Sequence, residues 1–195
     1  DREVELPGHA AAIVIMLKDW EIPPDDGGET QVRTWALITV SQVRWTALTI
    51  LRRLEPTVLA GHASAIADML EDSDASVRYN ALETLAKLEA AVLGQHAAAI
   101  VRQLDPDVNS DYAQFYPERP SYGTTDDGRY GLPLPPRQGG GAPPPWSGSQ
   151  VRLKALAALG KMDAATLAKH TEAVAAKFKD SEGDVRFRAR LMMHK

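Results

Sequence analysis

The sequence predicts an all-α fold, a right-handed α-solenoid of about four stacked helix pairs that form a single domain over residues 1–195. Three observations support this fold class. Apolar residues recur at helical spacing around a series of histidines. A Val-Arg dipeptide follows each of these histidines later in the chain. Copies of this pattern without insertions are 34 residues apart. Because each pair in such a stack contacts only its neighbours, the same buried positions are expected in every copy.

A histidine marks the first helix of each pair. His62 and His96 each have leucine three residues before, isoleucine four residues after and leucine eight residues after. The same positions around His9 and His170 are also apolar, and this spacing defines one side of an α-helix. No histidine is followed by glutamate, and the four histidines belong to different layers, which is unfavourable for a shared metal. We therefore expect surface histidines that make hydrogen bonds between neighbouring pairs.

The second helix of each pair begins near a Val-Arg dipeptide, at Val43, Val77, Val151 and Val185. In the second copy, Val77, Ala81, Leu85 and Leu88 fall at helical spacing. Asp74 precedes this stretch and is predicted to be its N-cap, because a carboxylate accepts hydrogen bonds from the free N–H groups of a first helical turn.

The distance from histidine to valine predicts two insertions between the helices of a pair. It is 15 residues in the second and fourth copies, but 34 in the first and 55 in the third. The predicted insertions span 20–38 in the first copy and 105–148 in the third. Within the first, the sequence allows either a second helix that starts early, near Thr30, or a separate short helix. The early start is favoured because its residues resemble those just downstream.

The second insertion has a composition of its own. It holds nine of the thirteen prolines and four of the five tyrosines. Proline at this density disfavours a helix or a central strand, and the aromatic content is unlike that of a flexible spacer. We expect an extended arm whose aromatic side chains contact either the helices or another protein. The residues expected to make this contact are Tyr112, Phe115, Tyr116, Tyr122, Tyr130 and Trp146.

The patterns L-x-x-H-A-x-x-I-x-x-x-L and D-x-x-V-R-x-x-A-L resemble HEAT repeats over roughly two thirds of the chain. They are similar to HEAT-like arrays of algae, of scaffold proteins and of phycobilin lyases. The resemblance implies a hydrogen-bond ladder between the turns of neighbouring repeats. Its members would be the structural residues Asp72, Arg78, Asp180 and Arg186. Pro106 occupies the aspartate position of the third repeat, which puts that rung in doubt.

Composition excludes several kinds of site. The chain has no cysteine, so disulfides, thiol nucleophiles and cysteine metal sites are absent. A net charge of −4 argues against bulk nucleic-acid binding, and no apolar run is long enough to span a membrane. The chain begins without an initiator methionine or a signal peptide, which predicts a processed protein or part of one.

Two further patterns, an acidic spacing and a recurring basic position, each allow a binding role or an ordinary structural role. Residues Asp105 to Asp111 have the acidic spacing of a calcium loop, but serine and tyrosine replace its essential glycine and glutamate, so a solvated helix end is favoured. Basic residues recur at one position, Arg53, Lys87, Lys161 and Lys195. A cationic stripe is one interpretation, but compensation of the helix dipole near each C-terminus is favoured.

The sequence therefore predicts a non-catalytic protein–protein interaction or scaffold module with no cofactor, metal or small-molecule substrate. We expect an accessory or stabilising subunit of a larger protein complex. The resemblance to algal arrays implies an organelle such as the chloroplast and an organellar or photosynthetic complex. The alternatives are a phycobilin-lyase-like protein that attaches chromophores and a transient assembly factor.

Overall fold

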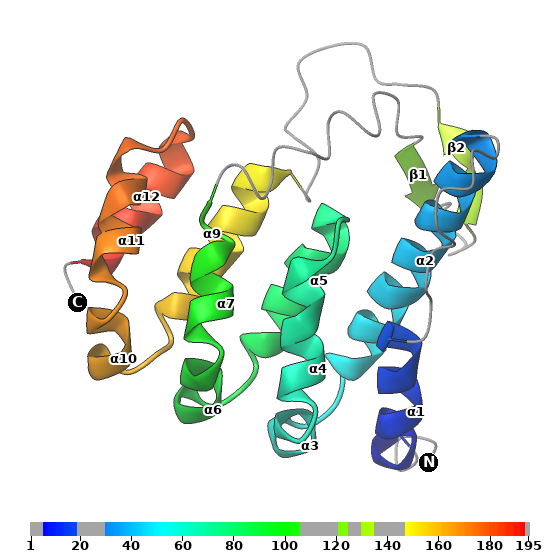
Figure 1. The fold of residues 1–195 in the computed structure, drawn as a ribbon, viewed down its shortest axis with the longest axis horizontal. Coiled ribbons are helices and arrows are strands. Elements are labelled where there is room, and N and C mark those ends of the chain that lie inside the picture. The colour runs from blue at the N-terminus through cyan, green and yellow to red at the C-terminus, as the bar shows by residue number, and fades with distance from the viewer. Residues whose placement is uncertain (1–5, 19–29, 106–120, 125–129, 135–146, 194–195) are drawn as a thin grey trace.

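The computed structural model describes residues 6–18, 30–105, 121–124, 130–134 and 147–193. This part of the chain is all-α apart from one short hairpin. Figure 1 shows the helices as a row of pairs that follows the chain from one end of the molecule to the other.

Each pair contains a first helix and a second helix. The first helices are α1 (Leu6–Lys18), α3 with α4 (Pro56–Ala60 and Ala63–Asp68), α6 with α7 (Ala90–Gln95 and Ala97–Arg102), and α10 with α11 (Ala164–Ala168 and Thr171–Ala176). Short 3-10 turns, η1 (Met69–Glu71) and η3 (Lys177–Lys179), follow α4 and α11. The second helices are α2 (Thr30–Leu51), α5 (Ala75–Leu85), α9 (Gly148–Leu159) and α12 (Gly183–Met192).

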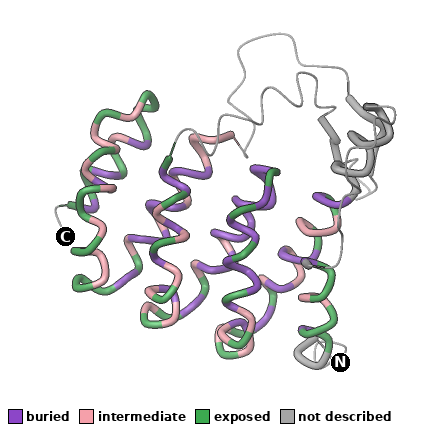
Figure 2. The backbone as a smooth tube through the Cα atoms, in the orientation of Figure 1, coloured by how far each residue is buried: buried purple, intermediate pink, exposed green. Residues whose placement is uncertain are grey.

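The second helices pack against one another in chain order, α2 on α5, α5 on α9 and α9 on α12. In each of the four pairs the first helix packs on its own second helix, α1 on α2, α4 on α5, α7 on α9 and α11 on α12. Leu51, Leu85 and Leu159, which occupy equivalent sequence positions, are all fully buried. Figure 2 shows the buried residues running through every helix pair. The recurring apolar positions predicted from the sequence therefore form the core.

Three of the first helices are interrupted at the recurring histidine. His62, His96 and His170 each have φ between −118° and −104° and ψ between 7° and 12°, outside the α-helical region. At each break the histidine N–H donates to the leucine carbonyl three residues before, at 2.9–3.0 Å. The histidine carbonyl then accepts from the N–H four residues after, at 3.1–3.2 Å. The sequence predicted one continuous helix at these places. That prediction was wrong, although the break is the same in all three copies.

Helix α2 begins at Thr30 and continues through 22 residues. This confirms the early start that the sequence favoured, so the back half of the first insertion belongs to the second helix. Asp74 is the N-cap of α5, as predicted, with its side chain accepting a hydrogen bond from the Ser76 N–H at 2.7 Å.

The second insertion contains a two-stranded antiparallel hairpin, β1 (Ser121–Thr124) and β2 (Tyr130–Leu134). Ser121 pairs with Leu134, Tyr122 with Pro133 and Thr124 with Tyr130. Proline is tolerated because both strands of a two-stranded sheet are edges. This hairpin was not predicted from the sequence. The segment expected to be an extended arm therefore contains a short pair of antiparallel strands.

Candidate interaction site

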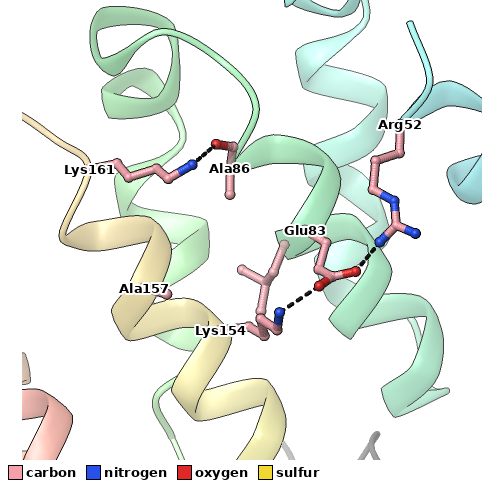
Figure 3. Close-up of a pocket in the computed structure, with 7 residues that line it drawn as sticks. Arg52, Glu83, Ala86, Lys154, Ala157 and Lys161 are labelled. Atoms are coloured by element: carbon pink, nitrogen blue, oxygen red, sulfur yellow. Dashed lines mark hydrogen bonds and ion pairs between the residues drawn. The ribbon is translucent and has the colours of Figure 1, made fainter.

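A surface hollow of about 270 Å³ lies where three successive second helices meet. Leu82, Ala86 and Ala157 supply apolar lining from α5, its C-terminal turn and α9. The charged lining residues are Arg52, Glu83, Lys154 and Lys161 (Figure 3). The stacking of the helices thus brings together residues that are up to about 110 positions apart in the sequence.

Glu83 is the central charge of this hollow. Its carboxylate pairs with Arg52 on one side and with Lys154 on the other, where Nζ lies 2.5 Å from Oε1. Figure 3 shows the two cations approaching Glu83 from different helices. One carboxylate therefore links the first, second and third helix pairs.

Lys154 also lies over an aromatic ring, with Nζ 4.9 Å from the centroid of Tyr79. Partial burial lowers the pKa of Lys154, but hydrogen bonds to Glu83 and Tyr79 outweigh this effect and leave the pKa above 10.5. Lys154 is therefore a stable cation at neutral pH.

Lys87 and Lys161 bond to the ends of the preceding second helices. Lys87 Nζ donates to the Arg52 carbonyl at 2.6 Å, and Lys161 Nζ donates to the Ala86 carbonyl at 2.5 Å. These carbonyls lie in the last helical turns, where the backbone lacks its own donors. These contacts confirm that Lys87 and Lys161, two of the four recurring basic residues, compensate the C-terminal ends of helices. The carbonyl belongs to the neighbouring helix, which the sequence interpretation did not specify. Arg53 is exposed, and Lys195 lies outside the described residues.

The turns are joined by two ion pairs that confirm part of the predicted ladder. Arg44 Nη1 lies 2.8 Å from Asp72 Oδ2 of the next pair, and Arg152 Nε lies 2.9 Å from Asp180 Oδ2. Asp72 and Asp180 also accept hydrogen bonds from the N–H groups two residues ahead, Asp74 and Glu182. Burial raises the pKa of Asp72, against the lowering effects of the Asp74 N–H and Arg44.

Arg78 and Arg186, the two arginines of the predicted ladder, bond to backbone carbonyls. Arg78 Nη1 donates to the carbonyls of Asp72 and Ser73, and Arg186 Nη1 donates to those of Asp180 and Ser181. In these contacts each arginine braces the turn just before its own helix. The links between pairs described above are formed by Arg44 and Arg152.

A glutamine joins the second and third pairs. Gln103 is fully buried, and its Nε2 donates to the Leu70 carbonyl at 2.8 Å. Proline has no side-chain acceptor, so Pro106 offers no equivalent of Asp72 or Asp180. At this junction the buried polar link is therefore a hydrogen bond from the Gln103 side chain and not an ion pair between arginine and aspartate.

The predicted contact residues of the arm fall largely outside the described part of the chain. This applies to Tyr112, Phe115, Tyr116 and Trp146. Tyr122 lies in β1 and Tyr130 in β2, and they are not directly paired in the hairpin register. The side chains of both tyrosines lie outside the described part of the structure, so their predicted contacts stay predictions.

Three of the four histidines do not make the expected hydrogen bonds among the described residues. Among the described residues, none joins the side chains of His62, His96 or His170 to a neighbouring pair. Their recurring role lies in the backbone of the helix break. The described ranges contain no cluster of three metal-ligating side chains, and of the proposed calcium loop only Asp105 is described.

No helix within the described ranges is both long and apolar enough to cross a lipid bilayer.

Sequence reasoning missed Arg52, Glu83, Lys154 and Gln103. These residues differ from those at equivalent positions in the other copies. For example, the position of Glu83 holds Thr49, Ala157 and Leu191. These contacts between pairs could therefore have been sought among residues that depart from the repeated pattern. A search for positions shared by all copies does not find them.

The chain matches no known family model, no curated protein and no solved structure.

Proposed function

We propose that the chain is a right-handed α-solenoid of four HEAT-like helix pairs that works as a non-catalytic protein–protein interaction module. The observation that carries this proposal is the row of second helices, which are linked side by side and leave an open, charged hollow across three of them. Side chains from successive layers of such a row present a broad surface suited to a protein partner. In this role the protein would be an accessory or stabilising subunit of a larger organellar or photosynthetic complex.

The proline-rich insertion is the proposed contact element. Its six aromatic residues, Tyr112, Phe115, Tyr116, Tyr122, Tyr130 and Trp146, would supply large apolar contact area to the partner. Its place between α7 and α9 supports this assignment, because a long insertion between two helices leaves the packing of the pairs intact.

Deletion of residues 107–147, with a short turn in their place, tests this proposal. We expect the circular dichroism spectrum and melting temperature to remain close to those of the full chain, while co-purification of the partner complex is lost. A variant that keeps the insertion but replaces its six aromatics with serine is the matched control for chain length, and it should lose the partner equally. If the deletion unfolds the helices, or if both variants retain the partner, the arm is not the contact element.

A phycobilin-lyase-like activity is the second candidate function, and it rests only on the resemblance of the repeats. Incubation with a free bilin and an acceptor phycobiliprotein subunit decides between the two. Covalent chromophore transfer, measured by absorbance after denaturing electrophoresis, would replace the scaffold proposal.

A transient assembly factor is the third candidate. It would be absent from the mature complex, whereas a structural subunit remains at fixed stoichiometry. Quantitative mass spectrometry of the purified complex separates these two roles.

A further inference from the structure

The charges of this protein are distributed very unevenly between its helices. The second helices with their last turns, residues 30–53, 75–87, 148–161 and 183–192, contain twelve Lys and Arg but only two Asp and Glu. The whole chain contains 22 basic and 26 acidic residues. The acidic excess therefore lies in the first helices, the turns and the insertions.

The hollow between α2, α5 and α9 concentrates part of this positive charge. Arg52, Lys154 and Lys161 line it, and Lys87 reaches the carbonyl of Arg52 at its edge. Among the described residues of the lining, Glu83 is the only carboxylate. It neutralises part of the charge of Arg52 and Lys154, while Lys87 and Lys161 donate to neutral backbone carbonyls. The hollow thus has three cations and one carboxylate in its lining, with a fourth cation, Lys87, beside it.

The same hollow has an apolar floor. Leu82 is almost fully buried, and Ala86 and Ala157 are half-buried beside it. A volume of about 270 Å³ is somewhat below the usual range for a whole small-molecule ligand. It is of a size to accept one or two side chains of a peptide.

We propose that this hollow, lined by Arg52, Lys154 and Lys161 around Leu82, Ala86 and Ala157 and with Lys87 beside it, binds an acidic segment of a protein partner. Carboxylates of the segment pair with the four cations, and one apolar side chain rests on the leucine and alanines. The inference deepens the proposed interaction function and rests on it. It assigns a second contact to the helices, separate from the arm.

A nucleic acid fits these charges less well. Outside the second helices the chain carries 24 acidic and 10 basic residues, which would repel a long polyanion. A short acidic peptide would contact only the basic hollow, and one of its apolar side chains would pack on Leu82, Ala86 and Ala157.

Fluorescence anisotropy with the full chain and a fluorescein-labelled peptide, Glu-Asp-Glu-Leu-Glu-Asp-Glu, tests the inference. A neutral peptide with Gln and Asn in place of Glu and Asp is the ligand control. We expect the acidic peptide to bind more tightly, and its affinity to fall as salt concentration rises.

The deciding variant is Lys154→Gln/Lys161→Gln, which should weaken peptide binding about tenfold. Its matched control is Lys169→Gln/Lys179→Gln, which removes two exposed lysines from the first helix of the fourth pair and should change affinity less than about twofold. Equal affinities of the two double variants would overturn the proposal.

The lysines at the hollow also join helices, so a second variant leaves all four cations in place. Ala157→Phe fills the hollow and should weaken binding of the leucine-containing peptide, but should have little effect on a peptide with serine in place of leucine. Identical effects on both peptides, or tighter binding of a single-stranded oligonucleotide of equal charge, would overturn the assignment to an acidic protein segment.

The arm deletion separates this inference from the proposed function. Without residues 107–147 the chain should still bind the acidic peptide, because the hollow is built from α2, α5 and α9. Loss of peptide binding in that folded deletion variant would contradict an independent site on the helices. Loss of the natural partner alone would leave the hollow as proposed.

Discussion

Arg152 and Asp180 form the most deeply buried ion pair described in the structure, with 8% and 3% of their side chains exposed. Arg152 belongs to α9 and Asp180 to the turn before α12, so the pair joins the third and fourth helix pairs. Removing one partner of a buried ion pair leaves the other charge without compensation. Without Arg152, Asp180 would retain the longer contact with Lys177, whose Nζ lies 3.9 Å from Oδ2 and compensates the charge only in part.

Arg152→Met should lower the free energy of unfolding by about 3 kcal/mol, measured by urea denaturation. The double variant Arg152→Met/Asp180→Asn should recover most of the loss, because no buried charge is left behind. Arg102→Met is the matched control. Its partner Glu71 is exposed, and its loss should cost less than about 1 kcal/mol. Equal losses for Arg152→Met and Arg102→Met would contradict this account.

Asp72 gives the protein a defined pH dependence. Burial raises its pKa above the ordinary value of 3.8, so the folded state binds the proton more tightly than the unfolded state. Its contribution to stability is therefore greatest at low pH and decreases as the pH rises from 3.8 through the folded-state pKa. Relative to Asp72→Asn, the wild-type chain should lose stability between about pH 3 and pH 7, measured by denaturant titration at both values. A relative gain over this range would show that pairing with Arg44 outweighs burial.

At the scale of residues, the sequence indicated the two aspartates of the ladder but not Arg44 and Arg152, the arginines that pair with them. Asp72 and Asp180 do link neighbouring pairs. The guanidinium of Arg78 instead bonds to the turn before its own helix, while Arg44, at the equivalent position, reaches forward to Asp72. A sequence position does not distinguish these two directions, because both acceptors are within reach of the same side chain.

At the scale of elements, the N-cap of α5 was predictable and the breaks in the first helices were not. The cap depends on Asp74 and the residues directly after it, which are local in the sequence. The break at His62, in contrast, keeps Leu59, Ile66 and Leu70 buried, so the apolar spacing is compatible with a continuous or an interrupted helix.

Asp74→Ala should destabilise the protein by about 1 kcal/mol, because its Oδ1 accepts both the N–H and the hydroxyl of Ser76, at 2.7 and 2.6 Å. Hydrogen exchange should accelerate first in the opening turn of α5. Asp74→Asn keeps a side-chain acceptor and should retain most of the stability. If alanine and asparagine are equally destabilising, capping is not the source of the effect.

At the scale of the whole molecule, α5 lies between α2 and α9, whereas α12 packs against α9 alone among the second helices. Helices with neighbours on both sides open less readily than those at an end. Amide exchange followed by mass spectrometry should therefore show the slowest exchange in α5 and faster exchange in α12. Uniform protection along the chain would indicate a single cooperative core.

The two insertions stay predictions from the distance between histidine and valine, because most of their residues lie outside the described part of the structure. Thr30 as the start of α2 followed from the similarity of two adjacent stretches. The hollow could not be predicted, since Arg52, Glu83 and Lys154 meet only when three pairs stack. Contacts between neighbouring helix pairs cannot be inferred from the residue spacing within one copy.

The differing polar links between layers have a consequence for folding. Arg44–Asp72 belongs to the first junction, Gln103–Leu70 to the second and Arg152–Asp180 to the third. Chains built from similar units are prone to dock the wrong units together or to exchange units between molecules. If the third pair docked directly on the first, Arg44 would lose the carboxylate of Asp72, because Pro106 at the equivalent sequence position has no side-chain acceptor. The irregularities among the copies therefore favour one order of assembly over its shuffled alternatives.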